Sequence, residues 1–200
     1  MKKNRIVILD NGHGDETPGK CSPDLSLFEW RWNRDFVQKL KERLEEIGYT
    51  VFDIVPEDND IALTARVKRA NKIINEYGAG NCIFISVHVN AAGMGEWMNA
   101  TGWSAWTTKG KTNSDKLAEY LCNACLSEGV KLRTDMSDGD KDWESNFTII
   151  YMTNCPAVLT ENMFMDNRRD LAFLKSEEGI EKLLNIHING INNYFDNKFK

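Results

Sequence analysis

A chain of 200 residues, of which 42% are hydrophobic, is long enough to bury one well-formed core. Its 25 basic and 30 acidic residues give a formal net charge of −5, and the positive charge is scattered rather than gathered into a stripe. Composition therefore argues against a protein that binds nucleic acid mainly through phosphate contacts.

Strand-like and helix-like patterns alternate along the chain. Short apolar runs predict strands, and apolar residues three and four apart predict helices that end at glycines such as Gly48 and Gly78. In chain order, the predicted elements are a strand over Arg5–Asp10, a helix through Trp32–Ile47, a strand over Thr50–Ile54, a helix over Leu63–Tyr77, strands over Cys82–His88 and Gly102–Thr107, a helix over Asn113–Ser127, strands over Phe147–Tyr151 and Ala157–Thr160, and a helix over Gly179–Phe195.

This interleaving predicts an α/β fold, a twisted and mostly parallel sheet flanked by helices on both faces. The run Cys82–His88 is apolar along most of its length, as expected of a strand covered on both sides. We find no internal repeat and no linker, so we expect residues 1–200 to form a single domain. The polar stretch Lys131–Ser145 is predicted to be a surface loop.

Five cysteines cannot all pair, and most lie in apolar stretches. Cys122 and Cys125 form a CxxC pair, but no second pair follows at zinc-finger spacing, so we interpret them as buried structural thiols. Reduced cysteines indicate synthesis in a reducing compartment. The apolar run at residues 6–9 is too short for a signal peptide, and no stretch could span a membrane. We therefore expect synthesis in the cytoplasm without an evident signal peptide.

Polar residues follow or end three of the predicted strands. His13 stands between two glycines after the first strand, His88 ends CIFISVH, and Glu161 ends AVLTE. Because ligands bind outside the carboxyl ends of parallel strands, these side chains are expected at one edge of the sheet. Glu29 precedes Trp32 by three residues, which places its carboxylate on the apolar stripe of the first helix. A glutamate there is costly unless it is paired or bound to a cation.

Each of these residues also has a structural interpretation when taken singly. His88 could be a hydrogen-bonded core histidine, Glu29 a helix N-terminal acid, and Glu161 a turn cap. His187 lies among apolar residues of the last helix, and we interpret it as structural. Together, however, two imidazoles and one carboxylate fit a catalytic zinc site with an open position. A separate carboxylate, for which Glu161 is suited, can then move the proton.

The motifs resemble those of a known family in their order. They are DNGHG, LFEWRWN, SVHVNA and PAVLTENMFMDN, and the similarity runs from about Ile6 into the last helix. The chain resembles the zinc-dependent N-acetylmuramoyl-L-alanine amidases of the Amidase_3 type. The resemblance implies that His13, Glu29 and His88 bind one zinc ion and that Glu161 is the catalytic carboxylate.

The resemblance also implies a substrate and a place of action. Members of this family hydrolyse the amide between N-acetylmuramic acid and L-alanine in peptidoglycan, so the chain is expected to be one catalytic amidase domain acting at the cell wall or periplasm. No separate wall-binding domain is expected. Asn11 and Asp15 depart from the usual proline and glycine around GHG and could reshape the cleft floor. Asn90 and Trp143 are the candidates for contact with substrate, whereas Trp103 and Trp106 are assigned to the core.

Other functions stay open on the sequence alone. One alternative is another zinc peptidase or deacylase on the same scaffold, and a second is a module that binds wall peptides without cutting them. A dinucleotide-binding domain is discounted because the G-x-G-x-x-G pattern fails at Thr17. A wall hydrolase without a leader would also suit a phage endolysin, which accumulates in the host cytoplasm before lysis.

Overall fold

The computed structural model describes residues 5–137 and 139–198. Residues 1–4, 138 and 199–200 lie outside the described residues. Three predictions include some of these positions: the N-terminal segment, the polar stretch Lys131–Ser145 and the single domain over residues 1–200. The elements in chain order are β1 (Ile6–Asn11), α1 (Glu29–Glu46), β2 (Thr50–Asp53), α2 (Leu63–Tyr77), the 3-10 turn η1 (Ala79–Asn81), β3 (Cys82–Asn90), β4 (Ser104–Thr107), α3 (Asn113–Ser127), β5 (Trp143–Glu144), α4 (Thr148–Tyr151), β6 (Ala157–Phe164), α5 (Arg168–Lys175) and α6 (Glu177–Lys198).

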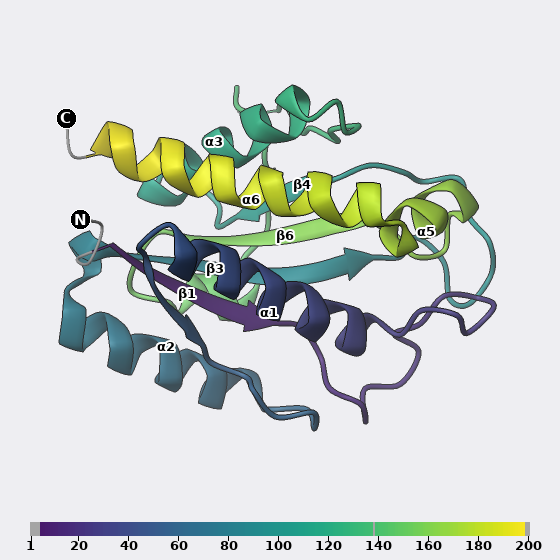
Figure 1. The fold of residues 1–200 in the computed structure, drawn as a ribbon, viewed down its shortest axis with the longest axis horizontal. Coiled ribbons are helices and arrows are strands. Elements are labelled where there is room, and N and C mark those ends of the chain that lie inside the picture. The colour runs from purple at the N-terminus through teal and green to yellow at the C-terminus, as the bar shows by residue number, and fades with distance from the viewer. Residues whose placement is uncertain (1–4, 138, 199–200) are drawn as a thin grey trace.

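The strands form one six-stranded sheet in the order β2-β1-β3-β6-β4-β5 (Figure 1). β1, β2, β3 and β6 are parallel to one another, whereas β4 and β5 are parallel to each other and run in the opposite direction. The predicted mostly parallel sheet is therefore confirmed, and its centre consists of β1, β3 and β6.

Each face of the sheet packs against its own set of helices. On β1, Val7 and Leu9 join the core formed with α1, α3, α5 and α6, whereas Ile6 and Ile8 join the core formed with α2 and α4. Successive residues of a strand point to opposite faces, so an unbroken apolar run such as IVIL is what a doubly covered strand requires. The predicted helices on both faces are confirmed (Figure 1).

The structure corrects three predictions between residues 131 and 164. Phe147–Tyr151 is not a strand, because Thr148–Tyr151 forms the short helix α4, which buries Ile149 and Ile150 against the sheet. The polar stretch Lys131–Ser145 is not loop throughout, since Trp143–Glu144 pairs with β4 as β5. β6 extends beyond Thr160 to Phe164, because β4 pairs with it as far as Glu161 and β3 as far as Phe164.

The thiols agree with the prediction. All five cysteines are free, and Cys82, Cys122 and Cys125 are buried. Burial raises the pKa of Cys125 to about 12, as expected of a structural thiol in apolar surroundings. Among the described residues, no helix has both the length and the apolar character needed to cross a membrane.

Candidate metal centre

The loop after β1 brings His13 to the carboxyl edge of the sheet in an unusual backbone conformation. His13 has a φ of 65°, in the left-handed region that non-glycine residues rarely enter. A Cβ atom on Gly12 would lie 2.1 Å from Cε1 of His88, and one on Gly14 would lie 2.1 Å from the backbone nitrogen of Asp60. The two glycines around His13 are therefore needed for close approach to neighbouring segments.

β3 and β6 position His88 and Glu161 side by side. The two residues are register partners in adjacent parallel strands. Side chains at paired positions of adjacent strands point to the same face, so the imidazole and the carboxyl group lie next to each other on the sheet. Glu161 lies within β6 rather than at its end, which corrects the predicted strand boundary.

Glu29 reaches the same place from the opposite direction. It is the first residue of α1 and only 1% exposed. Its Oε1 accepts a hydrogen bond from the backbone nitrogen of Val89 at 3.1 Å. The prediction that this glutamate lies on the buried stripe of the first helix is confirmed.

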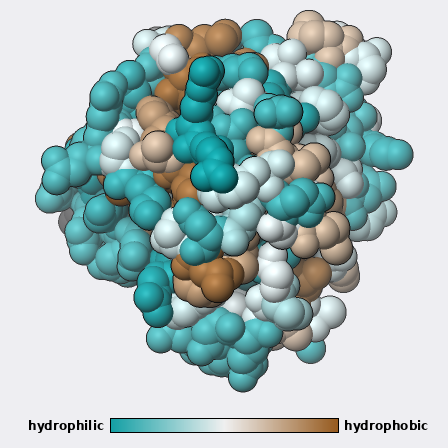
Figure 2. All heavy atoms as spheres, turned by 90° about the vertical axis from the view of Figure 1, so that its right-hand side faces the viewer, coloured by the Kyte–Doolittle hydropathy of each residue, from teal (hydrophilic) through white to brown (hydrophobic). Residues whose placement is uncertain are grey.

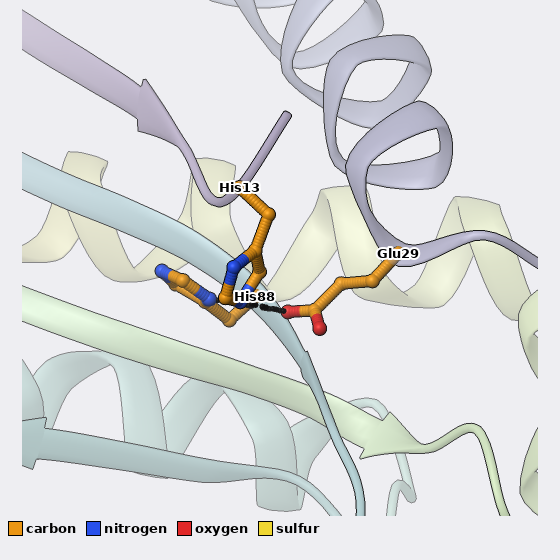
Figure 3. A group of neighbouring side chains, drawn as sticks. All are labelled: His13, Glu29 and His88. Atoms are coloured by element: carbon orange, nitrogen blue, oxygen red, sulfur yellow. Dashed lines mark hydrogen bonds and ion pairs between the residues drawn. The ribbon is translucent and has the colours of Figure 1, made fainter. Parts of the chain in front are cut away.

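These three side chains converge on one point (Figure 3). Oε1 of Glu29 lies 3.1 Å from Nδ1 of His88 and 3.4 Å from Nε2 of His13. The two imidazole rings meet edge to face with centroids 5.0 Å apart. One ligand atom from each residue lies within 4.8 Å of the others, and the described residues contain no other such group of three histidine, cysteine or acidic side chains. This donor set fits a divalent cation such as zinc.

Contacts with the two imidazoles favour the ionised form of Glu29. Burial disfavours the charged form of Glu29, but the hydrogen bonds with His13 and His88 outweigh it and hold the pKa of Glu29 well below its usual range. Burial works against protonation of His88, yet its contact with Glu29 prevails and raises the pKa of His88. A buried anion between two imidazoles is the arrangement expected of a preformed cation site.

Glu161 differs from Glu29 in its surroundings. Its Oε2 is buried and has no hydrogen-bond partner. Burial, opposed by nearby His88, raises the pKa of Glu161 to about 7. A carboxyl group with this pKa can both accept and release a proton near neutral pH.

An open groove of about 450 Å³ lies beside the two histidines on the α2 and α4 side. Its lining combines polar groups with apolar side chains. These residues are Asp10, Gly12, His13, Asp60, Ile61, Ala62, Leu63, Arg66, His88 and Ile149. Figure 2 shows the end of the molecule where the parallel strands finish, with hydrophobic residues in separate patches among hydrophilic ones.

The remaining sequence candidates have different environments. Asn90 lies two residues after His88 on β3, and its Oδ1 accepts from the backbone nitrogen of Ala91. Trp143 lies in the stretch predicted to be a surface loop, but it is packed: its ring lies on Trp106 at a centroid distance of 5.3 Å, and Cζ of Arg133 lies 5.0 Å from its centroid. The explanation is that β5 pairs it with β4.

The core assignments agree with the sequence. Trp103 is fully buried, and Trp106 is half-buried against the α2 and α4 core. His187 is buried in α6, where its Nδ1 lies 2.8 Å from the carbonyl oxygen of Leu183, and burial lowers its pKa to about 4. It is a structural core histidine, as predicted, and the lowered pKa favours its neutral form.

Sequence reasoning missed Arg66, which lies under the His13 loop. It is only 2% exposed and bonds the carbonyl oxygen of His13 and the carboxylate of Asp10. A signal was present, because Arg66 precedes Ala70 by four residues and Ile74 by eight, on the buried stripe of α2.

The fold and the gathered side chains define an α/β protein with a candidate metal centre at the carboxyl edge of its sheet. The family model described as N-acetylmuramoyl-L-alanine amidase, Amidase_3, matches residues 7–193. The chain belongs to this family.

Solved structures and curated relatives agree with this assignment. The fold is similar to that of the N-acetylmuramoyl-L-alanine amidase of Clostridium difficile 630, with a TM-score of 0.80, 25% identity, and coverage of 96% of this chain and 97% of the other. An amidase from Mycobacterium smegmatis shares the fold at a TM-score of 0.82 and 18% identity, with 98% of each chain covered.

Two relatives are longer than this chain. An endolysin of Bacillus phage SPP1 is 25% identical over 195 residues, which cover 94% of this chain and 65% of the endolysin. An N-acetylmuramoyl-L-alanine amidase of Neisseria meningitidis is 26% identical over 227 residues, which cover 96% of this chain and 53% of that protein. The chain thus spans about two thirds of the first and half of the second.

Proposed function

We propose that this chain is a zinc-dependent N-acetylmuramoyl-L-alanine amidase that cuts peptidoglycan at the cell wall or periplasm. In this proposal His13, Glu29 and His88 hold one zinc ion, Glu161 is the catalytic carboxylate, and the chain acts as one catalytic domain. The observation that carries it is the convergence of the three ligand atoms within 4.8 Å beside Glu161. Membership of the amidase family supports the substrate class.

The reaction is hydrolysis of the amide between the lactyl group of N-acetylmuramic acid and L-alanine. A zinc ion bound here would supply Lewis-acid chemistry, polarising the scissile carbonyl and activating a water. The oxygen of water adds to the lactyl carbonyl carbon, the C–N bond breaks, and a proton passes to the alanine nitrogen. The chain's own contribution is to hold the reactants and to move that proton.

Glu161 is suited to the proton transfer. Its carboxyl group lies next to His88 on the neighbouring strand, and its buried Oε2 has no competing hydrogen-bond partner. Because its pKa is raised to about 7, it can take a proton from the attacking water and release it to the leaving nitrogen.

Two further residues are proposed to contact substrate. Asn90 follows His88 on the same face of β3, where its amide can hydrogen-bond a peptide. Trp143 is half-buried, and it is proposed to offer the exposed part of its ring to a sugar or peptide side chain, beside its contact with Trp106. Replacing these residues tests binding separately from chemistry.

The test of Glu161 is the Glu161→Gln variant, which keeps the shape of the side chain and removes its basicity. We expect hydrolysis of purified peptidoglycan to fall by roughly 10²-fold or more, since positioned proton transfer contributes ~10²–10⁴-fold. Zinc content should equal that of the unmodified protein. Glu46→Gln, at an exposed position late in α1, is the matched control and should retain full activity. If zinc-loaded Glu161→Gln hydrolysed peptidoglycan as fast as the unmodified protein, Glu161 would not be the catalytic carboxylate.

Product analysis separates the proposed reaction from its alternatives. Mass spectrometry should find free muramyl lactate and a stem peptide with an N-terminal alanine. A different scissile bond would indicate another zinc peptidase or deacylase, and binding without cleavage would indicate a wall-peptide binding module. A phage endolysin and a bacterial amidase resemble the chain at 25% and 26% identity, so the proposal concerns the reaction and not the biological origin.

A further inference from the structure

Arg66 joins two segments beneath the candidate metal centre. Every one of its five N–H groups has an acceptor, and the acceptors lie at the end of β1, in the loop that follows it and in the loop before α2. They are the carbonyl oxygen of Ile61 (2.6 Å from Nε), Oδ1 of Asp10 and the carbonyl oxygen of Asn11 (3.0 and 2.6 Å from Nη1), and the carbonyl oxygen of His13 and Oδ1 of Asp60 (3.0 and 3.1 Å from Nη2).

The charge of Arg66 is matched inside the protein. Asp10 is 1% exposed, and its two oxygens accept from Arg66 and, at 2.5 Å, from Oγ of Ser86. Removing one partner of a buried ion pair leaves an uncompensated charge, so loss of Arg66 is expected to disturb the segment that carries Asp10. Asp10 is three residues before His13, which links this pair directly to the ligand loop.

His13 needs such support because of its backbone. A non-glycine residue in the left-handed region costs free energy and persists only where its surroundings fix it. The carbonyl oxygen of His13 accepts from both Arg66 and Arg34, whose Nη2 atoms lie 3.0 and 3.1 Å away. Two guanidinium groups thus hold the peptide that sets the direction of the His13 side chain.

We infer that Arg66 is a positioning residue that fixes the backbone of His13, so that its imidazole faces Glu29 and His88 before a metal ion binds. The inference rests on the proposed metal site. It requires a planar donor fork, since Nη2 of the guanidinium bonds both His13 and Asp60 while Nε bonds Ile61. Lysine has the charge but not this geometry.

The experiment compares Arg66→Lys and Arg66→Met with Arg69→Met. Arg69 lies three residues further along α2 and bonds Ile54 and Glu57 rather than the ligand loop. The zinc dissociation constant of each purified chain is measured by competition with a chromophoric chelator. The unfolding temperature of the metal-free form and the absorption spectrum of the cobalt(II)-loaded form are measured on the same samples.

We expect both Arg66 variants to bind zinc about 10–100-fold more weakly, as is typical when a group that orients a metal ligand is removed. Their cobalt(II) spectra should also change. Arg69→Met should bind zinc as the unmodified chain does, even if its metal-free form unfolds at a lower temperature. Arg66→Lys keeps the positive charge beside Asp10, so it decides the question if Arg66→Met does not fold.

Two results would overturn the inference in distinguishable ways. Arg66→Lys with unchanged zinc affinity and spectrum would show that Arg66 acts on stability alone, and the proposed function would stand. Failure of the unmodified chain itself to bind zinc would remove the proposed metal site and this inference with it. An equal loss of zinc affinity in Arg69→Met would also contradict a specific role for Arg66.

Discussion

Gly12 allows the loop that carries His13 to lie close to the strand that carries His88, because it has no Cβ atom. A Cβ on Gly12 would overlap the His88 ring, with its nearest atom 2.1 Å away. The ring is held by Glu29 at 3.1 Å, so it cannot move without breaking that contact. Gly12 therefore contributes to the site by lacking a side chain, and the histidine pair depends on it.

We expect Gly12→Ala to lower the zinc content of the purified chain, because the extra methyl group must displace either His88 or the ligand loop. Zinc per chain after dialysis, measured by elemental analysis, gives the result. Gly80→Ala is the control, since a Cβ there has no atom within 4 Å and its φ is ordinary. Retention of the full zinc content by Gly12→Ala would contradict this account.

Glu29 and Arg66 both lie on the buried stripe of a helix, but only Glu29 was recognised from the sequence as a candidate site residue. Glu29 is conspicuous in the sequence because a carboxylate at apolar spacing is costly to bury unless it is paired or bound to a cation. Arg66 occupies the same kind of position on α2, but a long arginine stem commonly lies along apolar surface with its head in solvent. Only the structure shows that this guanidinium turns inward to Asp10 and His13.

Among the elements, the pair α3 and α6 depends on a small residue at its closest contact. A Cβ on Gly190 of α6 would lie 2.6 Å from Cδ2 and 2.9 Å from Cα of Leu121 in α3. The second of these atoms belongs to the backbone, so a rotamer change cannot relieve the overlap. The two helices must separate to admit a methyl group.

Gly190→Ala is expected to destabilise the fold by about 1–3 kcal/mol, the usual cost of overpacking, although alanine favours helix by about 1 kcal/mol over glycine. Chemical denaturation gives the free energy of unfolding. Asn193→Ala changes an exposed position of the same helix and should stay within about 0.5 kcal/mol of the unmodified chain. If Gly190→Ala were as stable as the unmodified chain, α3 and α6 could move apart without measurable cost, and the prediction would be wrong.

Elements with a clear period were predictable, and short ones were not. α3 begins and ends where its apolar spacing indicates, and Thr112 and Asp115 form a capping box at its start. The segment 147–151 is rich in residues that favour strands, yet tertiary packing makes it a single helical turn. The eight-residue helix α5 was not predicted, although Asn167 caps it, because its polarity is mixed.

At the scale of the whole molecule, the stretch before α4 is fastened to the sheet by a buried acid. Asp142 is 2% exposed, and its Oδ2 accepts from Oγ1 of Thr107 in β4 at 2.6 Å. Burial, together with nearby Asp140, raises the pKa of Asp142 to about 7. In the unfolded chain an aspartate has a pKa of about 3.9.

The fold therefore binds a proton at Asp142 more tightly than the unfolded chain does, and its stability should fall as pH rises from about 4 to about 7. Other groups titrate in this range, so the comparison is with Asp142→Asn. We expect the free energy of unfolding to decline less between pH 5 and pH 8 in this variant than in the unmodified chain. Equal declines would show that Asp142 does not carry the effect.

The order of strands has a consequence for self-association. The margins of the sheet are β2 and β5, which have only four and two residues, whereas the long strands β3 and β6 are paired on both sides. A free edge can template pairing with a neighbouring molecule, and a short edge offers few backbone groups for it. The apolar strands that carry His88 and Glu161 are thus shielded from intermolecular β-pairing at high concentration.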